Sequence, residues 1–581
     1  MEVEQDIYSM SNTAPKSKTK PKRKFNSWVN NPVLEDYALR YAPKSFRKWS
    51  SFSVASSALG GIAFLADFAI GASISISYGF TNAFWGIVAA AVIIFLTGIP
   101  IGYYSAKYNV DMDLLTRGAG FGYLGSTLTS LVYATFTFIY FSTEGAIMAQ
   151  ALEVYFHLPL AIGYLVSTLI VIPLVLFGMT ALSKLQVWTQ PIWLVLMIAP
   201  ILAILMKNPQ AFNAWLHFEG NSPEGTAFNP LFFAMASGVV LSLITQIGEQ
   251  ADYLRFMPDQ TSKNRKKWLW AVILSGPGWI ILGSFKQLSG SFLASYIAPS
   301  VGLAKANEPI QMFIKAFSEF IPGTFVVLTI ATFFVLLSQV KINVTNAYSG
   351  SLSWSNFFSR LLHFHPGRVV WLILQVAIAI TLMEAGLFGF LNTVLGFYSN
   401  VAVAWIGAIV ADLVINKKLL KLSPPYIEFK RAHLYNFNPV GFGSMIIASI
   451  VSILAYFGVF GAVLQAFSPF LSLILAFILA PIIAIATKGK YYIARENPIM
   501  QTQLEMVAGV MVEDEAEAPA GSSRAHHHHH VNKNGEVTCS VCGFDYEPMD
   551  STYCPFHKGM ICSLCCSLEK DCHDMCKKAT F

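Results

Sequence analysis

Long apolar runs separated by short polar segments dominate the chain from about residue 51 to residue 490. Many of these runs have the roughly 20 residues that a helix needs to cross a ~30 Å hydrocarbon core. The pattern predicts an all-α membrane protein with about twelve transmembrane helices. We expect these helices near 52–79, 82–104, 121–152, 158–181, 183–206, 228–250, 268–290, 323–350, 369–391, 393–416, 440–461 and 465–487.

Lysine and arginine gather in every second connection between the expected spans. The connections on the other side contain only Lys207, Lys305 and Lys315. Because basic residues favour the cytoplasmic side of a membrane, the alternation predicts that both termini are cytoplasmic. The first fifty residues are polar and lack the apolar region of a cleavable signal peptide. We therefore expect a multi-pass protein of the cell (inner) membrane.

Composition agrees with a chain whose main partner is the lipid bilayer. Hydrophobic residues make up 54% of it and charged residues only 12%, against about a quarter charged in soluble domains. The net charge of +6 comes largely from a basic run at 16–24. Beside a spanning body, such a run marks a cytoplasmic terminus more simply than a nucleic-acid site, and we expect no nucleic-acid partner.

Changes in composition divide the chain into four parts. Residues 1–50 form a basic cytoplasmic segment, 51–490 the transmembrane domain, 491–534 a flexible linker and 535–581 a cysteine-rich module. The linker contains five consecutive histidines at 526–530. They are either an engineered tag or a native tract that binds metal loosely, and we assign them no role.

Several expected spans contain polar side chains that hydrocarbon rejects. An ionised side chain at the bilayer centre costs at least ~2.5–3.5 kcal/mol, so it normally faces a cavity or a partner. Some of these residues could lie near the interface or form static ion pairs, but their recurrence in several helices favours a polar pathway. The set comprises Asp67, Tyr140, Glu144, Gln246, Glu249, Asp252, Lys286, Lys341, Asn343, Asn346 and Glu384.

Glycines suggest where helices break. Gly60 and Gly61 in the first span, and Gly238 and Gly248 in the sixth, take corresponding places if spans 1–5 and 6–10 are inverted repeats. A helix broken within the membrane is tolerable where its free backbone groups line a cavity or bind a ligand. Small residues also permit close helix packing, which is the alternative explanation.

Four stretches of the sequence together resemble nucleobase–cation symport family 1, over about residues 34–490. This family includes cytosine, purine, allantoin and hydantoin permeases. The resemblance implies a LeuT-type fold of two inverted five-helix repeats plus two helices, and secondary transport of a nucleobase or related nitrogen heterocycle. The stretches are LEDYALRYAPKSFRKWSSFSVASSALGGIAFLADFAIGAS from residue 34, FIYFSTEGAIMAQAL from 138, QADYLRFMP from 250 and KINVTNAYSGSLSWSNFF from 341.

The resemblance also implies a substrate site on the third span. Tyr140 and Glu144 stand where hydantoin-type members carry a tryptophan that stacks on the substrate ring and a glutamine that hydrogen-bonds it. An ionised carboxylate only accepts hydrogen bonds, so Glu144 suits a ring N–H or a cationic substrate better than a carbonyl. We add Gln246, Asn343 and Asn346 to the expected substrate-binding residues.

A lysine occupies the region where sodium-coupled members bind their ion. In those members, hydroxyl groups of the eighth span help to bind Na⁺ near the break in the first span, and Lys341 falls at or beside that place. Because a fixed ammonium group competes with Na⁺, we expect a proton-coupled, uncoupled or ligand-sensing protein rather than a sodium symporter. We assign ion coupling to Lys341 and Asp67, and expect Lys341 to pair with Asp67 or another carboxylate within the membrane.

All eight cysteines lie in the last part of the chain, in doublets with the spacing of zinc knuckles. Four doublets can supply two tetrahedral zinc sites, and an interleaved pairing of the doublets is our expectation. One zinc ion with spare cysteines, a disulfide framework and an iron–sulfur cluster are the alternatives. The expected ligands are Cys539, Cys542, Cys554, His557, Cys562, Cys565, Cys572, His573 and Cys576, with Cys566 in excess.

Two functional hypotheses follow. The first is a secondary transporter that works by alternating access. The second is a transporter-like sensor that relays substrate occupancy through the zinc module to a cytoplasmic signalling protein. The sequence has no phosphate-binding loop, nucleophile elbow or open zinc site that would indicate an enzyme, so we expect none.

Overall fold

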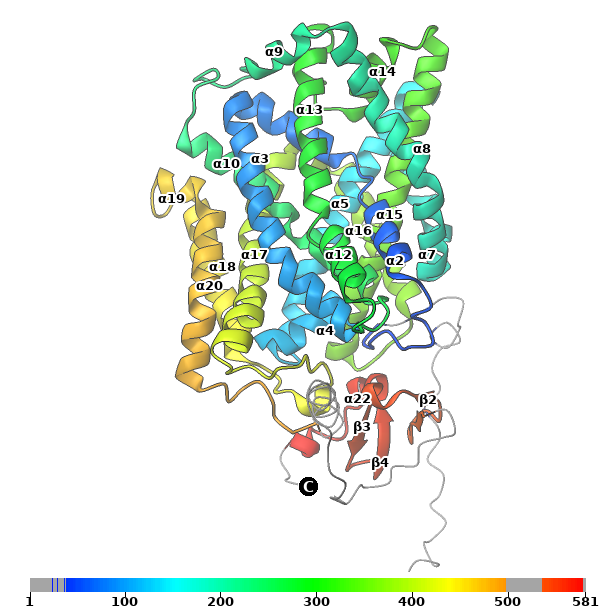
Figure 1. The fold of residues 1–581 in the computed structure, drawn as a ribbon, viewed down its shortest axis with the longest axis vertical. Helices are drawn as coiled ribbons and strands as arrows, with labels where there is room; N and C mark the ends of the chain where they lie inside the picture. Colours follow the sequence, from blue (N-terminus) through cyan, green and yellow to red (C-terminus); the bar gives the residue numbers. More distant parts are fainter. Residues whose placement is uncertain (1–22, 24–28, 30–35, 37, 498–534, 578–581) are drawn as a thin grey trace, which may run out of the picture.

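The computed structural model describes residues 23, 29, 36, 38–497 and 535–577. Most of the basic run and the five histidines lie outside the described residues. Every one of the twelve expected ranges contains helix, and the helices run mainly along the long axis of the molecule (Figure 1). The apolar runs therefore fold as predicted, into an all-helical body with a small separate module.

The transmembrane body is built from long helices and short helical turns. Their bounds are α2 Ser51–Gly60, α3 Ala66–Tyr108, α4 Met112–Thr116, η1 Arg117–Phe121, α5 Gly125–Phe156, α6 Leu160–Leu169, α7 Ile172–Leu176, α8 Gly178–Lys207, α9 Gln210–Leu216, α10 Pro230–Leu241, η2 Ser242–Thr245, α11 Gln246–Leu254, α12 Arg265–Ser275, α13 Trp279–Val301, α14 Pro309–Ser318, α15 Thr324–Leu362, α16 Arg368–Glu384, η3 Leu387–Phe390, α17 Leu391–Ala411, η4 Asp412–Leu419, η5 Arg431–His433, η6 Pro439–Gly443, α18 Ser444–Tyr456, α19 Ala462–Ala466 and α20 Ser468–Thr487.

By length and apolar composition, eight helices in the described part of the chain can cross a membrane, or nine if the bent pair α5 and α6–α7 forms one span. This count treats α3 as a single helix. Its 43 residues would extend about 65 Å, which is about twice the thickness of the hydrocarbon core. The backbone of α3 turns at Gly79, where φ is 77°. The multi-pass body is confirmed, and the number of about twelve spans stays a prediction.

Two expected spans depart from regular α-helix in the middle of the body, the first at Gly60 and Gly61 and the sixth between Gly238 and Gly248. α2 ends at Gly60 and α3 begins at Ala66, with non-helical backbone between them. In the sixth expected span, α10 passes through the 3₁₀ turn η2 into α11. Helix α3 packs against both α10 and α13, and α5 packs against α15.

Helices α3 and α13 approach each other closely because glycines face the contact. A Cβ atom added to Gly71 would lie 1.8 Å from the carbonyl oxygen of Gln287, and one added to Gly290 would lie 2.1 Å from that of Phe68. Only a residue without a side chain allows this separation. The close packing brings the first turn of α3 beside the middle of α13.

The cysteine-rich module consists of two small antiparallel sheets and a helix. Strands β1 (Val537–Thr538) and β2 (Asp545–Tyr546) form one sheet, and β3 (Ser551–Cys554) and β4 (Gly559–Cys562) form the other, before α22 (Ser563–Leu568). In the second sheet Ser551 is opposite Cys562 and Cys554 is opposite Gly559.

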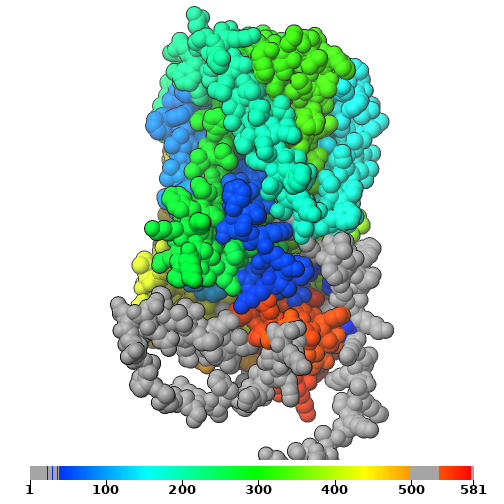
Figure 2. Space-filling view, turned by 45° about the vertical axis from the view of Figure 1, so that its right-hand side comes forward, coloured from blue at the N-terminus to red at the C-terminus, as the bar shows by residue number. Residues whose placement is uncertain are grey.

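The module lies against one end of the transmembrane body (Figures 1 and 2). Arg40 pairs with Asp550 at 2.6 Å, so the described N-terminal residues lie at the same end. The connection between η4 and η6 also contacts the module, with Arg431 at 2.9 Å from Asp574. Both described terminal regions therefore lie on one side of the body.

Candidate functional site

The two residues expected to bind substrate lie between the interrupted helices. Tyr140 and Glu144 are one turn apart on α5, and both are buried. The Tyr140 hydroxyl lies 3.0 Å from the hydroxyl of Ser242 in η2. The Glu144 carboxylate accepts the backbone N–H of Ala66, at 3.3 Å, where α3 begins after its break. One helix thus presents an aromatic ring to one break and a carboxylate to the other.

Helix α15 completes the surroundings of this carboxylate. The side-chain amide of Gln339 donates a short hydrogen bond to the Glu144 carboxylate and a second bond, at 3.0 Å, to the Glu144 carbonyl. Two kinds of donor, a helix N-terminus and an amide, therefore stabilise negative charge at Glu144.

A buried ion pair lies beside it, at the first turn of α3. The Lys286 ammonium of α13 is 2.9 Å from the Asp67 carboxylate, and the Gln287 amide donates to Asp67 at 2.7 Å. Lys286 also donates to the carbonyl oxygens of Ile62, at 2.6 Å, and Phe64, at 3.0 Å. These carbonyls belong to the unwound backbone between α2 and α3, so a tethered ammonium group satisfies the oxygens that the break leaves free.

The sequence shows Lys286 as a charge within a span but does not indicate its role in the site. Its spacing in the chain carries no sign of the contact, because Asp67 and Lys286 are brought together only by the packing of α3 on α13. A basic residue in the seventh span and an acidic residue just after the break of the first span are the signals that could have suggested the pair.

The expected pairing of Lys341 with a carboxylate is wrong in this structure. The Lys341 ammonium instead donates to the carbonyl of Gln186, at 2.9 Å, and to the hydroxyl of Thr189, at 2.8 Å, both on α8. Residues two positions apart on a helix point to nearly opposite faces. Because Gln339 faces Glu144, Lys341 faces α8 and cannot reach Asp67 on the other side.

The remaining expected substrate residues are buried but engaged with other groups. Gln246 donates to the Glu249 carboxylate at 2.7 Å. Asn343 donates to the carbonyl of Phe141 at 3.3 Å, and Asn346 donates to the side-chain oxygen of Asn343 at 3.2 Å. The structure therefore groups Tyr140, Glu144 and Asp67 closely, and places the two asparagines on the flank of α5.

A cavity of about 360 Å³ lies elsewhere, between α3, α10, α17, α18, α19 and the start of α20, and none of the expected substrate residues lines it. Tyr78, Asn392 and Tyr456 are among its lining residues. The expected site is thus closed to solvent in this conformation, since all seven of its residues are buried.

The family-like stretch from residue 250 contains the motif Asp252-x-x-Arg255, which contributes to a separate buried network towards the module end. Arg255 pairs with Asp111 at 3.0 Å, and Asp252 accepts the Tyr133 hydroxyl at 2.9 Å. The two motif residues therefore bind different partners, which join α11 to the start of α4 and to α5.

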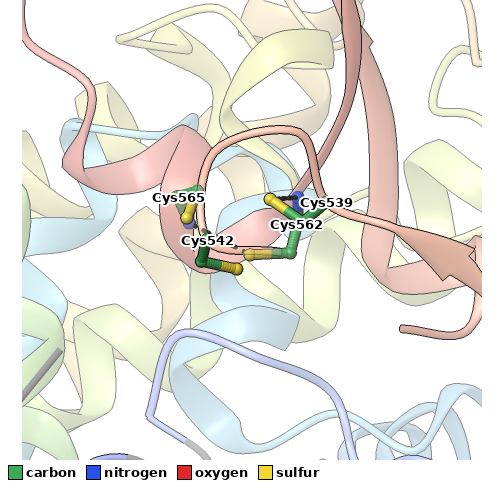
Figure 3. Close-up of side chains that lie close together, drawn as sticks. All are labelled: Cys539, Cys542, Cys562 and Cys565. Carbon is green, nitrogen blue, oxygen red and sulfur yellow. Dashed lines mark hydrogen bonds between the residues drawn. The ribbon is translucent and has the colours of Figure 1, made fainter. Parts of the chain in front are cut away.

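Four cysteines of the module form a cluster that could hold a metal ion (Figure 3). Cys539 and Cys542 come from the turn between β1 and β2, whereas Cys562 and Cys565 come from the end of β4 and the start of α22. Their sulfur atoms all lie within 4.8 Å of one another. The first doublet thus meets the third, which agrees with the interleaved pairing.

Backbone N–H groups point at these sulfur atoms. The Cys565 N–H is 3.3 Å from the Cys562 sulfur, and the Cys562 N–H is 3.4 Å from the Cys539 sulfur. Gly543 follows the first doublet with φ of 78°, a conformation that glycine adopts without strain. Such donors favour thiolates, which are the form that binds a metal.

The other expected ligands do not join this cluster. His557 pairs with Glu569 at 2.7 Å, and His573 is exposed. Cys554, Cys572 and Cys576 are buried, and all eight cysteines are free thiols. A disulfide framework does not form in the structure.

Interrupted helices around a buried polar site, within a multi-pass body, define a transporter rather than an enzyme. Residues 41–477 match the family described as permease for cytosine/purines, uracil, thiamine, allantoin. The chain belongs to this family, the nucleobase–cation symport family 1.

Among curated proteins, the chain is similar to "Putative purine-cytosine permease YxlA" of Bacillus subtilis (strain 168). The two are 22% identical over 337 residues, which cover 56% of this chain and 67% of the relative.

Two solved transporters share the fold. MHP1, a nucleobase-cation-symport-1 family transporter with bromovinylhydantoin bound in a closed conformation, is 15% identical, with a TM-score of 0.57 over 79% of this chain and 99% of its own. A Na⁺-coupled sialic acid symporter in a substrate-bound outward-open state is 14% identical, with a TM-score of 0.53 over 79% of this chain and 93% of its own. The LeuT-like architecture expected from the resemblance is thus confirmed at the level of the fold.

Proposed function

We propose that the protein is a secondary transporter for a nucleobase or related nitrogen heterocycle, and that Tyr140 and Glu144 contact the substrate. The observation that carries this proposal is the buried Glu144 carboxylate, which lies at the N-terminus of α3 and one turn from an aromatic ring. A heterocycle can stack on the ring and donate a ring N–H to the carboxylate. Family membership supplies the substrate class.

Nearby buried groups have hydrogen-bonding capacity to spare. Within the described chain, Glu249 Oε1, Gln287 Oε1 and Asn346 Oδ1 are buried without a hydrogen-bond partner. Leaving such an atom unpaired costs about 1–3 kcal/mol. We assign Gln246, Asn343 and Asn346 to the substrate site as well. The substrate would reach these residues when the helices move apart during alternating access. The site is closed here, so substrate entry requires that movement.

We further propose that transport is not coupled to sodium. The Lys286 ammonium contacts two carbonyl oxygens of the helix break and the Asp67 carboxylate, the types of oxygen ligand that a metal cation would use. Lys341 lies on α15, near the other side of the same break. A cation added to this region would have to displace or repel a fixed positive charge.

Uptake into proteoliposomes tests both proposals. Radiolabelled purines and pyrimidines should accumulate equally when choline replaces Na⁺ outside, because Lys286 already supplies the positive charge. Replacement of one partner, in Lys286→Met, should lower stability by about 3–5 kcal/mol, since it leaves the Asp67 charge buried and unpaired.

The double variant Lys286→Met with Asp67→Asn serves as the matched control, because it removes both charges. It should restore most of the stability while uptake stays low or becomes dependent on Na⁺. Uptake by the unmodified protein that ceases without Na⁺ would contradict the sodium-independent mechanism.

A second candidate function is a membrane sensor, favoured by the contacts between the module and the body. Arg431 and His433 in the η4–η6 connection, and Arg40 before α2, all bind module residues. Movement of the helices could therefore shift the module and present it to a cytoplasmic partner. In the assay above, saturable binding without net uptake would favour this function over transport.

For the module we propose one zinc ion bound by Cys539, Cys542, Cys562 and Cys565, at the cytoplasmic face of the cell (inner) membrane. Four convergent cysteine sulfurs suit tetrahedral Zn²⁺. The module is too small to bury a large core, so metal binding would contribute much of its folding free energy.

A further inference from the structure

Four further cysteines surround a second, very small cavity in the module. The cavity has a volume of about 10 Å³, room for one water-sized particle. These four cysteines, Cys554, Cys566, Cys572 and Cys576, are buried. The cavity is lined by Arg431, Ala432, Thr552, Tyr553, Cys554, Ile561, Cys566, Glu569, Cys572, Asp574 and Cys576. Because Arg431 and Ala432 belong to the body, the cavity lies at the junction between the body and the module.

Cys566 reaches this cavity because it directly follows a ligand of the first cluster. Successive residues on a helix are rotated by about 100°. On α22, Cys565 therefore points towards the first cluster while Cys566 points to another side, where it lines the small cavity together with Cys554, Cys572 and Cys576. The cysteine that seemed to be in excess in the sequence thus has three thiol neighbours of its own.

The histidines that the sequence offered as ligands are directed elsewhere. The His557 ring nitrogen bonds to the Glu569 carboxylate at 2.7 Å. His573 is exposed, in a left-handed turn with φ of 44°. Neither residue lines the cavity. The two carboxylates in the lining already have partners, Glu569 in His557 and Asp574 in Arg431. The remaining donors are four sulfur atoms, which is the ligand set of a structural zinc site.

Positive side chains lie close to these cysteines. Arg431 donates to the Cys566 carbonyl at 3.1 Å, and Arg495 donates to the carbonyl of Tyr553, which precedes Cys554, at 2.9 Å. Lys577 directly follows Cys576. Four thiolates and one Zn²⁺ carry a net charge of −2, which these cations offset.

We propose that Cys554, Cys566, Cys572 and Cys576 bind a second zinc ion at the junction between the module and the body. In the described chain, only the first cluster has three or more ligand atoms within 4.8 Å. Binding of the second ion therefore requires these four sulfur atoms to move closer together.

The segment from Cys572 to Cys576 also contacts the body. Asp574 lies between the two cysteines, and its carboxylate accepts hydrogen bonds from Arg431, at 2.9 Å, and Asn436, at 3.1 Å. An ion that fixes Cys572 and Cys576 also fixes Asp574. Zinc at this site consequently stabilises the docked position of the module as well as the fold of the module.

The metal content of the full chain, purified in detergent with zinc, tests this inference. It rests on the proposed metal binding of the module but not on transport. Native mass spectrometry should find two zinc ions in the unmodified protein and one in Cys566→Ser. The variant Cys539→Ser should also retain one ion, whereas His557→Ala, the matched control, should retain two.

One ion in the unmodified protein, two ions in Cys566→Ser, or a loss of one ion in His557→Ala would overturn this ligand set. If Cys539→Ser keeps every ion, the first cluster rather than the second is refuted. Should Cys566→Ser fail to fold, alkylation of the unmodified chain decides the matter. Cys554, Cys566, Cys572 and Cys576 should then become reactive together when a chelator removes zinc, and alkylation of Cys566 in the zinc-loaded chain would contradict the site.

Discussion

At the scale of single residues, the centre of the molecule is a cluster of buried charges with assigned partners. The Glu144 carboxylate accepts hydrogen bonds from the Ala66 N–H and the Gln339 amide. The Asp67 carboxylate forms an ion pair with the Lys286 ammonium group. In a low-dielectric interior each of these groups depends strongly on its partner. The hydrogen-bond partners of Glu144 are neutral donors, so a substitution there that keeps the shape but removes the charge should reveal function with less damage to the fold than a change at the Asp67–Lys286 pair.

We expect Glu144→Gln to express and unfold like the unmodified protein while its substrate preference changes. Glutamine has the same shape, and its amide oxygen can still accept the Ala66 N–H. The negative acceptor is lost, however, and hydrogen bonds to charged groups contribute about 1.5–3 kcal/mol. Affinity for heterocycles that donate a ring N–H should fall about 10- to 100-fold in competition binding.

Tyr140→Phe is the control for this variant. It keeps the ring and removes only the hydroxyl that contacts Ser242, so stacking ligands should bind almost as before. If Glu144→Gln leaves the affinity of every tested heterocycle unchanged, Glu144 does not contact the substrate.

At the scale of helices, the site depends on how closely α3 and α13 pack. The contact is possible because Gly71 and Gly290 have no side chains. It brings Asp67 to Lys286, and it holds the unwound segment before α3 against the ammonium group. The same packing argument accounts for Lys341, whose face of α15 is turned towards α8.

Gly71→Ala should destabilise the protein, because the new methyl group would lie 1.8 Å from the Gln287 carbonyl oxygen on α13. Overpacking of this kind typically costs about 1–3 kcal/mol, and the helices must move apart to relieve it. Gly389→Ala is the matched control, since an added methyl group there meets nothing within 4 Å. Thermal unfolding in detergent should show a lower Tm for Gly71→Ala than for the unmodified protein and an unchanged Tm for Gly389→Ala. If Gly71→Ala also leaves the Tm unchanged, α3 and α13 can accommodate a methyl group at their contact.

At the scale of the whole molecule, the module is attached to the body by polar contacts that respond to pH. His433 is buried between the two, with one ring nitrogen 3.0 Å from the Arg495 carbonyl and the other 2.9 Å from the Thr552 hydroxyl. Burial lowers the pKa of His433 to about 4, so the docked state keeps the ring neutral.

Docking should weaken as the pH falls from about 6.5 towards 4. A released His433 regains a pKa near ~6.5, so the undocked state binds more protons in this range and acid favours it. At pH 5.5 the loss amounts to about 1.4 kcal/mol, or about tenfold in the docking equilibrium. This loss of docking free energy can be measured by the hydrogen-exchange protection of residues 535–577 in the full chain, corrected for intrinsic exchange rates.

His433→Gln is the control, because it keeps polar groups at this position but does not titrate. Loss of zinc in acid affects both proteins alike, so the difference between their pH profiles isolates the histidine. Identical profiles would show that His433 stays buried when the module leaves the body.

The sequence by itself determined the elements and the chemistry available to them. Apolar runs of spanning length can only be satisfied as helices in a membrane, and the structure has helix in every expected range. Residues one turn apart on one helix must share a face, so Tyr140 and Glu144 were predictable as neighbours. Cysteine doublets likewise indicated metal sites, because their spacing is local.

The tertiary structure alone decided which distant groups meet. Asp67 forms its ion pair with Lys286 rather than with Lys341. This pairing depends on the rotation of α15 and on the close contact of α3 with α13. Cys566 shares a cavity with three other cysteines because α22 directs it away from the cluster that contains Cys565. A side chain's type and its local spacing are written in the sequence, whereas its partner across the fold depends on how whole helices rotate and pack, which no local pattern encodes.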